Sequence, residues 1–422
     1  MLPVPHLETA LTGPLLQLEK QFLSKQVEIE SWFRSQWQLT PPPFYGSVDL
    51  RNAGFKLAPV DTNLFPAGFN NLNLEMMALC VQAVQSTMAE KCPNATRLLL
   101  IPESHTRNIF YFENLALLAE ILERAGFDVR IASLIPDLKE PLQQTLPSGR
   151  EIMLEPLIRE NDRVGVNGFF PCCIILNNDF SAGVPAILKN TQQQFLPSLK
   201  LGWSTRLKSD HFRYYEKVSE AFAKIVDIDP WLINPYFDHC GEVDFSNQNN
   251  QACLAERASQ LFEKIRHKYV KYKIDQAPFV VVKADQGTYG MAVMMIQDPL
   301  ELVNLNRKQR TKMSSLKGGA AVTKVILQEG VYTFETVGDD NAVAEPVVYH
   351  IGRYVVGGFY RIHKNKGIDE NLNAPGMDFQ PLAFAKNCYL PPCKKNHETV
   401  NRFYAYGVVG RLAMVAAARE VL

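Results

Sequence analysis

The sequence lacks net charge, with 44 lysines and arginines balanced by 44 aspartates and glutamates among 422 residues. It also lacks a long block of like charges, so neither nucleic-acid binding nor a charged interaction tail is expected. No uninterrupted apolar run reaches the roughly 18 residues needed to span a bilayer. Residues 1–8 lack a basic segment and are interrupted by prolines, unlike a signal peptide. We therefore expect a soluble cytoplasmic protein that binds neither membrane nor nucleic acid.

Cysteine is sparse, and its distribution argues against a disulfide framework. The eight cysteines are Cys80, Cys92, Cys172, Cys173, Cys240, Cys253, Cys388 and Cys393. In a chain of this length without a secretion signal we expect free thiols, some of them buried. The spacing Cys388-x4-Cys393-x3-His397 leaves a zinc site as an alternative, although no second pair lies nearby. A Cys–His nucleophile is a further alternative, but no histidine lies in a recognisable nucleophile motif.

The remaining composition, with 46% hydrophobic and 21% charged residues, is typical of a globular protein. The length predicts two or three subdomains rather than one simple core. Apolar spacing predicts an amphipathic helix over residues 14–37. A strand, a helix and a second strand follow over residues 97–133, and residues 172–176 are another apolar strand. Residues 251–272 predict a further helix, and residues 403–422 a helix buried on nearly all sides.

One strand and the loop after it, residues 279–293, stand out chemically. Phe279 to Val282 is apolar and rich in β-branched residues, which predicts a buried strand with Lys283 at its end. The loop contains Gly287 and Gly290, which let backbone N–H groups approach an oxyanion, and the lysine adds a point charge suited to phosphate. The pattern is neither a Walker loop nor a dinucleotide fingerprint. A buried strand, a satisfied lysine and a simple hairpin turn would explain it equally well.

Three more segments follow in order. Residues 324–331 form an apolar strand that runs into the polar pair Gln328-Glu329. Residues 345–362 form short strands about a glycine turn, and residues 369–376 read Asp-Glu-Asn-Leu-Asn-Ala-Pro-Gly. Together the four segments resemble the nucleotide hairpin, adenine hinge, metal-ligand hairpin and Arg…Asn-Leu-x-Ala-x-Gly signature of glutathione-synthetase-like ATP-grasp ligases. Two departures are the presence of only two glycines in the loop and Pro375 where glycine is common.

This resemblance implies ATP and Mg²⁺ as cofactors. The catalytic residues would be Lys283, at the α- and β-phosphates, and Arg361, at the transferring phosphoryl group. Nucleotide contacts would come from Lys283, Gly287, Thr288, Tyr289, Gly290, Gln328 and Glu329, with Lys271 or Lys273 as a second phosphate lysine. The metal ligands would be Glu345, Asn371 and one of Asp369 or Glu370, whose hard oxygens suit Mg²⁺. Each assignment has a structural alternative. Lys283 could be a surface lysine, Arg361 could form a salt bridge across a sheet, and Asp369 and Glu370 could belong to a solvated loop.

Polar segments in the amino-terminal half extend the resemblance. They are residues 48–71, 101–108, 177–181 and 203–208, and with them nearly the whole chain resembles the ATP-grasp-like branch of glutamate–cysteine ligases. Binding an α-amino acid calls for a cation or N–H nest at one end and a carboxylate at the other. The candidate substrate contacts expected in loops are Arg51, Asp61, Glu103, Arg107 and Arg206, and neutral contacts would come from Asn63, Asn70 and Asn178. For each of these residues alone, a structural role in a turn or a helix cap would explain its presence about as well as contact with a substrate.

We therefore predict an α/β fold in which an N-terminal open α/β substrate domain precedes an ATP-grasp unit, made of a hairpin lid and a C-terminal α+β subdomain. The expected boundaries are 1–45 for a helix and linker, 46–250 for the substrate domain, 251–328 for the lid and 329–422 for the catalytic subdomain. The resemblance implies ligation of the γ-carboxylate of L-glutamate, through an acyl phosphate, to L-cysteine, the first step of glutathione synthesis. Glutathione synthetase, another amino-acid ligase or a non-enzymatic nucleotide-binding regulator are alternatives. A homo-oligomer is compatible with the sequence.

Overall fold

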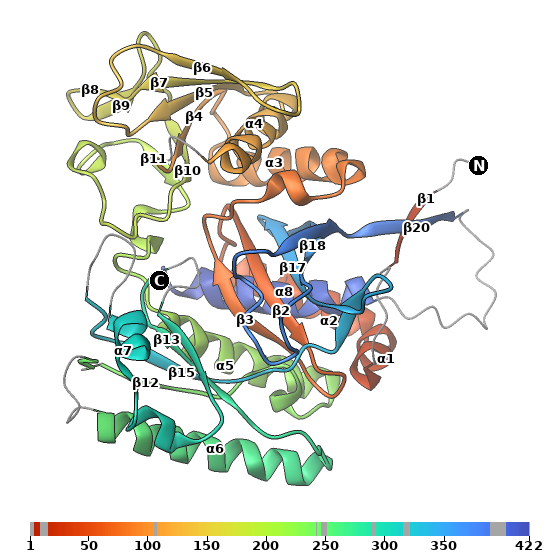
Figure 1. Ribbon diagram of the computed structural model, residues 1–422. Coiled ribbons are helices and arrows are strands. Elements are labelled where there is room, and N and C mark those ends of the chain that lie inside the picture. Colours follow the sequence, from red (N-terminus) through yellow and green to blue (C-terminus); the bar gives the residue numbers. More distant parts are fainter. Residues whose placement is uncertain are drawn as a thin grey trace.

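The computed structural model describes residues 4–8, 16–104, 108–241, 243–245, 251–287, 292–314, 321–388 and 402–421. Three larger sheets organise these residues, and Figure 1 shows them one above another. We call them the parallel sheet, the central sheet and the hairpin sheet. Two small antiparallel pairs complete the strands: β1 (Val4–Glu8) with β20 (Ala383–Cys388), and β8 (Ile158–Glu160) with β9 (Arg163–Gly165).

The parallel sheet forms the upper part of Figure 1 and has the strand order β11-β10-β4-β5-β7-β6. Its strands are β4 (Arg97–Pro102), β5 (Asp128–Ser133), β6 (Leu142–Thr145), β7 (Glu151–Pro156), β10 (Cys173–Asn177) and β11 (Gln194–Leu196). β6 runs antiparallel to β7, whereas the other neighbours are parallel. The helices α3 (Met77–Lys91) and α4 (Ile109–Arg124) share a hydrophobic core with this sheet. The predicted strand–helix–strand unit is confirmed, and Gly126, at φ +102°, follows the end of α4.

The central sheet joins the two ends of the chain. Its order is β19-β18-β17-β2-β3, and β16 pairs with one end of β17. The strands are β2 (Tyr45–Asn52), β3 (Leu57–Asn63), β16 (Glu335–Val337), β17 (Ala342–Ile351), β18 (Tyr354–His363) and β19 (Asp378–Pro381). The predicted loop placement of Arg51 and Asp61 is therefore wrong, because both lie on strands, β2 and β3. Their segment is rich in polar and turn-forming residues, which hid its pairing with β17.

The hairpin sheet is antiparallel and has the order β12-β15-β13-β14. Its strands are β12 (Phe237–Cys240), β13 (Val280–Ala284), β14 (Val293–Ile296) and β15 (Val325–Glu329). Helix α6 (Gln251–Tyr272) covers one face, where Leu261 and Phe262 pack in one core with Val280 and Val282. Helix α7 (Arg307–Ser314) lies between β14 and β15 in the chain. The predicted strand at 279–282 and the predicted helix at 251–272 are both confirmed.

The predicted amino-terminal helix is divided in two. The structure has α1 (Gln17–Ser24) and α2 (Gln26–Leu39), with Lys25 between them in a non-helical conformation, φ −109° and ψ 19°. The N–H of Lys25 is shared by the carbonyls of Gln21 and Phe22, which is typical of a helix end. Phe22, Ile29 and Phe33 still share one buried face, so the predicted amphipathic pattern spans both helices.

Helix α8 (Arg402–Arg419) lies behind β2 and β3 in Figure 1 and contacts β2, β3 and β17. On its other sides it meets α1 and α5 (Lys208–Val226). The run from Leu412 to Ala418 is at most 1% exposed, which confirms the predicted buried helix. No helix within the described ranges is both long and apolar enough for a membrane crossing.

Candidate active site

A polar cleft lies between the central sheet and the hairpin sheet. One wall comes from β2, β3, β17 and β18, and the other from β13, β14 and β15. The lining residues are Asp49, Arg51, Val60, Asp61, Val281, Lys283, Gly287, Val293, Met295, Gln328, Glu329, Val331, Glu345, Arg361, Asn371 and Asn373. The antiparallel pairing of distant segments thus gathers several of the predicted site residues in one place.

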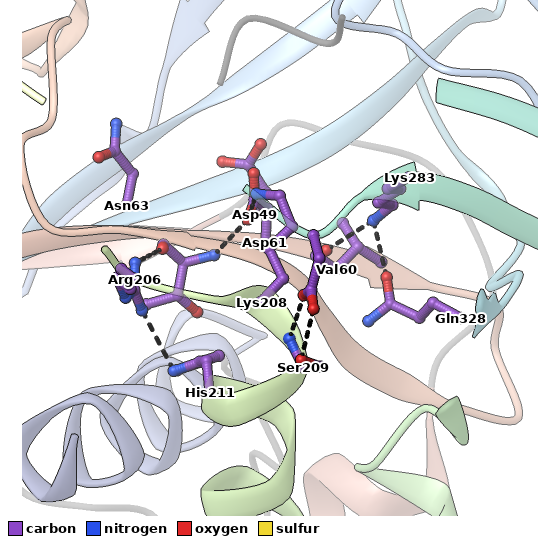
Figure 2. A network of polar contacts seen from close by, with 12 residues as sticks. Asp49, Val60, Asp61, Asn63, Arg206, Lys208, Ser209, His211, Lys283 and Gln328 are labelled. Atoms are coloured by element: carbon purple, nitrogen blue, oxygen red, sulfur yellow. Dashed lines mark hydrogen bonds and ion pairs between the residues drawn. The ribbon is translucent and has the colours of Figure 1, made fainter. Parts of the chain in front are cut away.

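Lys283 enters the cleft because of the alternation along β13. Val280, Val282 and Ala284 point into the core under α6, so Val281 and Lys283 face the other way. The Lys283 ammonium donates to the carbonyl of Val60 at 2.8 Å and to Oε1 of Gln328 at 2.7 Å, as Figure 2 shows. Burial lowers the pKa of Lys283 to about 8, against the opposing charge of Asp61.

Strand β15 presents its polar pair to two different environments. Gln328 is 1% exposed, its Oε1 accepts from Lys283, and no described residue accepts from its Nε2. Glu329 instead accepts from Lys56 at 2.8 Å and from the Trp231 indole N–H at 3.0 Å. The backbone N–H of Glu329 donates to the carbonyl of Tyr236 at 2.7 Å. This N–H is therefore already paired, and the unpaired donor of the pair is the Gln328 side chain. The hinge role of Gln328 and Glu329 stays a prediction.

Two arginines hold one carboxylate at the floor of the cleft. Arg51 Nε lies 2.9 Å from Glu345 Oε2, and Arg361 Nη1 lies 2.6 Å from Glu345 Oε1. Arg361 also donates to Asp49 Oδ2 at 2.8 Å, while no described residue accepts from its buried Nε. Burial alone would raise the pKa of Glu345, but the two arginines hold it below its ordinary value. For Asp49 burial prevails over Arg361, and the pKa is raised.

A second lysine lies near Lys283, and sequence reasoning missed it. Lys208, at the start of α5, donates to Asp61 Oδ1 at 2.9 Å, and its ammonium lies 4.1 Å from the ring centre of Trp203. Burial alone would raise the pKa of Asp61, but Lys208 and Lys283 bring it down to about 2. Figure 2 shows Asp61 and Lys208 beside the Lys283 contacts. Lys208 closes the segment 203–208 that extends the resemblance, but the resemblance gave this lysine no role, so it was not distinguished from surface lysines.

The base of the glycine loop is fixed to α5. Asp285, directly after β13, accepts from the backbone N–H and the hydroxyl of Ser209, both at 2.7 Å. A carboxylate at a helix N-terminus satisfies unpaired N–H groups and suits the helix dipole. Gly287 follows at φ +96° and lines the cleft. Thr288, Tyr289 and Gly290, the other predicted loop contacts, lie outside the described residues.

Comparison with known proteins decides the family. The sequence matches the glutamate–cysteine ligase family over residues 19–421. The chain belongs to the glutamate–cysteine ligase family. Among solved structures it is 55% identical, with a TM-score of 0.88, to a "putative gamma-glutamylcysteine synthetase" from Methylobacillus flagellatus KT, over 100% of this chain and 99% of the other. No curated protein gave a match.

A second solved structure is far more distant. It is D-alanyl-alanine synthetase A from Vibrio cholerae O1 biovar eltor str. N16961, with 10% identity and a TM-score of 0.33 over 75% of this chain and 81% of the other. That likeness carries no weight here. The mixed sheets confirm the predicted α/β class, while the ATP-grasp assignment stays a prediction. The family match makes the protein an ATP-dependent carbon–nitrogen ligase.

Arg206 of the ligase is not a cleft residue. Its Nε lies 2.6 Å from Glu420 Oε2, and its Nη1 donates to the carbonyl of Thr62 at 2.6 Å. His211 Nδ1 shares Glu420 at 2.6 Å, and we call these three side chains the Glu420 clasp. Arg206 and His211 bring the pKa of Glu420 down to about 2 although burial opposes this, while burial lowers the pKa of His211. Arg206 lies two residues before Lys208 in the chain. The clasp can therefore help to position Lys208, although Arg206 itself does not line the cleft.

Several other predicted contacts of the ligase lie away from the cleft. Lys271 is exposed on α6 and pairs with Asp229 at 2.8 Å, and Lys273, just beyond that helix, does not line the cleft either. Asn63 accepts from the N–H of Phe65, and Asn70 contacts its neighbour Asn71. The second phosphate lysine is therefore not found where it was predicted.

Glu103 and Asn178 share a different cavity, of about 650 Å³, at the carboxyl ends of β4, β5 and β10. Asn178 is held there by the carbonyl of Pro102 and the N–H of Phe180. Arg107 lies outside the described residues, as do Cys393 and His397 of the predicted zinc spacing.

The residues of the ligase fit a nucleotide better than a preformed metal centre. Within the described ranges, no three histidines, cysteines, aspartates or glutamates are grouped to hold a metal ion. Glu345 and Asn371 line the cleft, as predicted, but both oxygens of Glu345 accept from arginines. The predicted choice between Asp369 and Glu370 is not supported, because neither lines the cleft. Glu370 instead binds Lys366 at 2.8 Å and the N–H of Gly367 at 2.7 Å.

Proposed function

We propose that this cleft uses ATP to join the γ-carboxylate of L-glutamate to the amino group of L-cysteine, giving γ-glutamylcysteine, ADP and phosphate. One observation carries the proposal: in a chain of this family, Lys283, Arg51 and Arg361 converge on one cavity with the carboxylates of Asp49, Asp61 and Glu345. Cations of this number suit a triphosphate, and carboxylates beside them suit an ammonium group. The printed name of the Methylobacillus flagellatus relative agrees with these substrates.

The nucleotide end of the cleft is the face of the hairpin sheet. Val281, Val293 and Met295 give it an apolar wall on which a base can stack. Lys283 and the backbone at Gly287 meet the phosphates, as the sequence suggests. Lys208 does not line the cleft itself, but it pairs with Asp61, which does, so Lys208 is the second lysine in place of Lys271 and Lys273. The unpaired Nε2 of Gln328 is a donor for a nucleotide oxygen or nitrogen.

The central sheet holds the reacting groups. Glutamate's carboxylate attacks the γ-phosphorus, ADP leaves, and the cysteine amine then attacks the acyl phosphate and releases phosphate. Arg361 and Arg51 neutralise the charge that develops on the phosphoryl oxygens, in a buried site where preorganised cations act strongly. Of the cleft carboxylates, Asp49 has a raised pKa through burial, so it is the best acceptor for the proton that the amine must lose.

Mg²⁺ when bound would neutralise part of the triphosphate charge. Glu345 and Asn371 are the cleft residues that would hold it, since Mg²⁺ often takes only one or two protein carboxylates and completes its shell with phosphates and water. Arg51 and Asp61 remain as contacts for the amino-acid substrates. A cytoplasmic location and a homo-oligomer stay predictions.

A phosphate-release screen of amino-acid pairs tests the function. With ATP and Mg²⁺, phosphate should be released when glutamate and an amine acceptor are both present, with cysteine as the best acceptor. Mass spectrometry should find γ-glutamylcysteine. Faster turnover of γ-glutamylcysteine with glycine would replace the proposal by glutathione synthetase, and nucleotide binding without turnover of any pair would favour the regulatory alternative.

A further inference from the structure

The indole ring of Trp203 meets two cations beside the cleft. Trp203, in the turn before α5, is 2% exposed. The Lys208 ammonium lies 4.1 Å from its ring centre, and the guanidinium carbon of Arg206 lies 4.7 Å from it. Both distances are within the roughly 6 Å at which the face of an aromatic ring attracts a cation. Each cation also has a carboxylate partner, because Lys208 binds Asp61 and Arg206 binds Glu420.

The polar edge of the indole is not what the site uses. The ring N–H of Trp203 is buried, and no described residue accepts a hydrogen bond from it. An unpaired buried donor costs free energy, which a phenylalanine would avoid at this position. The turn itself is held by its backbone, since the main-chain N–H of Trp203 donates to the carbonyl of Asp179 at 2.8 Å. The ring face is therefore the part of the side chain that has charged partners.

The ion pair between Lys208 and Asp61 needs a further contact to stay in place. Its nitrogen–oxygen distance is 2.9 Å, but the Asp61 side chain keeps 39% of its surface exposed. Ion pairs that solvent reaches contribute little, because water screens the attraction and both side chains lose freedom. The Lys208 side chain is only 8% exposed, so its contact with the indole face is shielded from water, where such contacts are strongest.

We propose that Trp203 is a positioning residue of the ligase, whose ring face keeps the Lys208 ammonium on Asp61. The inference rests on the proposed function, in which Lys283 meets phosphate and Lys208 is the second lysine. With Lys208 in place, Asp61 has a cation of its own, and the Lys283 ammonium is left to the nucleotide.

The contacts of Lys283 agree with this division of charges. Both of its hydrogen bonds within the described residues go to uncharged oxygens, those of Val60 and Gln328. Burial lowers the pKa of Lys283 and the charge of Asp61 opposes this, so the two groups already attract each other. If Lys208 left Asp61, that carboxylate would draw Lys283 toward itself. ATP would then have to displace Asp61 before phosphate could bind, so the cost appears in ATP binding more than in the chemical step.

A pair of variants of similar side-chain volume tests the role of the ring face. Trp203→Phe and Trp203→Leu both lack the indole N–H, but only phenylalanine keeps an aromatic face. Calorimetry with ATP and Mg²⁺ should show an affinity about tenfold weaker in Trp203→Leu, equivalent to about 1.4 kcal/mol, and about threefold weaker in Trp203→Phe. The KM for ATP should rise in the same order, while kcat stays within about threefold.

Trp32→Leu is the matched control. Trp32 lies on α2, where its ring contacts Phe33 and Phe222 in the core. The control variant loses an indole of similar size and should keep the ATP affinity of the unmodified protein. Melting curves establish that each variant is folded. If Trp203→Leu does not fold, Trp203→Phe takes its place in every comparison.

A double-mutant cycle with Lys208→Met separates positioning from packing. In the Lys208→Met protein the ammonium is absent, so Trp203→Leu should change the ATP affinity by less than about twofold. An equal loss in the two backgrounds would overturn the proposal, since the ring would then act through its bulk. Equal effects of Trp203→Phe and Trp203→Leu in the presence of Lys208 would overturn it as well.

Calorimetry also separates this inference from the proposed function, because it needs no turnover. An unchanged ATP affinity in Lys208→Met would overturn the positioning role and leave the ligation of glutamate and cysteine standing. The expected order of affinities without phosphate release from any pair of amino acids would overturn the ligase proposal and support the positioning role.

Discussion

At the scale of single residues, Lys283 carries the sharpest prediction. Its ammonium is partly buried in the cleft and is one of the cations available to phosphate. Lys283→Ala should lower turnover by on the order of a hundredfold or more, since losing one preorganised stabiliser of developing charge typically costs that much. Lys271→Ala is the matched control, because Lys271 pairs with Asp229 on the surface and should leave turnover nearly normal. Equal kinetics of the two folded variants would remove Lys283 from the site.

The ionisation of Lys283 predicts a pH dependence. Burial lowers the folded pKa from 10.5 to about 8, so the free enzyme loses this positive charge as pH rises past about 8. The kcat/KM for ATP, which reports the free enzyme, should fall in that range. Lys283→Arg should abolish the fall if it retains activity, because a guanidinium keeps its proton there. A profile of the unmodified enzyme that stays flat to pH 10 would contradict this assignment.

The lowered pKa of Lys283 also makes the stability of the fold depend on pH. Between pH 8 and 10.5 the unfolded chain keeps the Lys283 proton that the folded chain has released. Folding therefore becomes more favourable as pH rises through this window, because the desolvation cost of a buried ammonium disappears. Lys56, whose pKa burial also lowers to about 8, adds to the same trend.

The individual site residues were predictable by two routes. Lys283 ends an apolar strand before a glycine loop, so its pattern indicated its place. Glu345 and Arg361, which face each other on β17 and β18, were named through the family resemblance. Asp49 and Lys208 became site residues through pairing of distant segments, which one sequence does not reveal. Lys271 had the right chemistry, but it lies on the outer face of α6.

At the scale of elements, the glycines of α8 give a paired prediction. A Cβ on Gly410 would lie 2.6 Å from His350 Nε2 in the core, whereas a Cβ on Gly407 would meet Val355 at an ordinary 3.4 Å. Gly410→Ala should destabilise the fold by about 1–3 kcal/mol through overpacking. Gly407→Ala should be neutral or add up to about 1 kcal/mol from helix propensity. Denaturant melts decide the matter, and equal effects of the two changes would refute this account of the packing.

The Glu420 clasp at the end of α8 gives another prediction. Glu420→Gln keeps the shape but removes the charge that holds Arg206 and His211, and Arg206 neighbours Lys208. If the clasp positions Lys208 on Asp61, the KM for ATP should rise several-fold while kcat changes less. Arg213→Gln is the control, because Arg213 is an exposed residue of the same helix α5 that pairs with Asp210. A loss of stability with unchanged KM would make the clasp purely structural.

Elements of strong periodicity were the most predictable part of the fold. The buried helix α8, helix α6 and the β4–α4–β5 unit follow from apolar spacing alone. The interruption at Lys25 was not predicted, since the apolar face continues across it. The strands β2 and β3 were not predicted, for another reason. Several of their side chains line the polar cleft, so their composition resembles that of a loop.

At the scale of the molecule, the cleft between two sheets predicts that ligand and fold stabilise each other. ATP held by Lys283 on β13 and by arginines on β2 and β18 would join the hairpin sheet to the central sheet. At 100 times its Kd it should stabilise the protein by about 2.7 kcal/mol, visible as a melting temperature raised by several degrees. Lys283→Ala should reduce the shift. An ATP-independent melting temperature under saturating ATP and Mg²⁺ would contradict the proposed binding mode.

The central sheet is built from strands that are synthesised far apart in time. Val48 on β2 lies opposite Val348 on β17, which leaves the ribosome about 300 residues later. At roughly 5–20 residues per second, the newborn strand waits about 15–60 s for its partner. During that interval the β2–β3 hairpin has an open edge that other chains could join, whereas the parallel sheet, complete by Leu196, can already fold. The nascent protein should therefore carry a folded parallel sheet and an incomplete central sheet. Fast overexpression should favour aggregation through the open edge of β2.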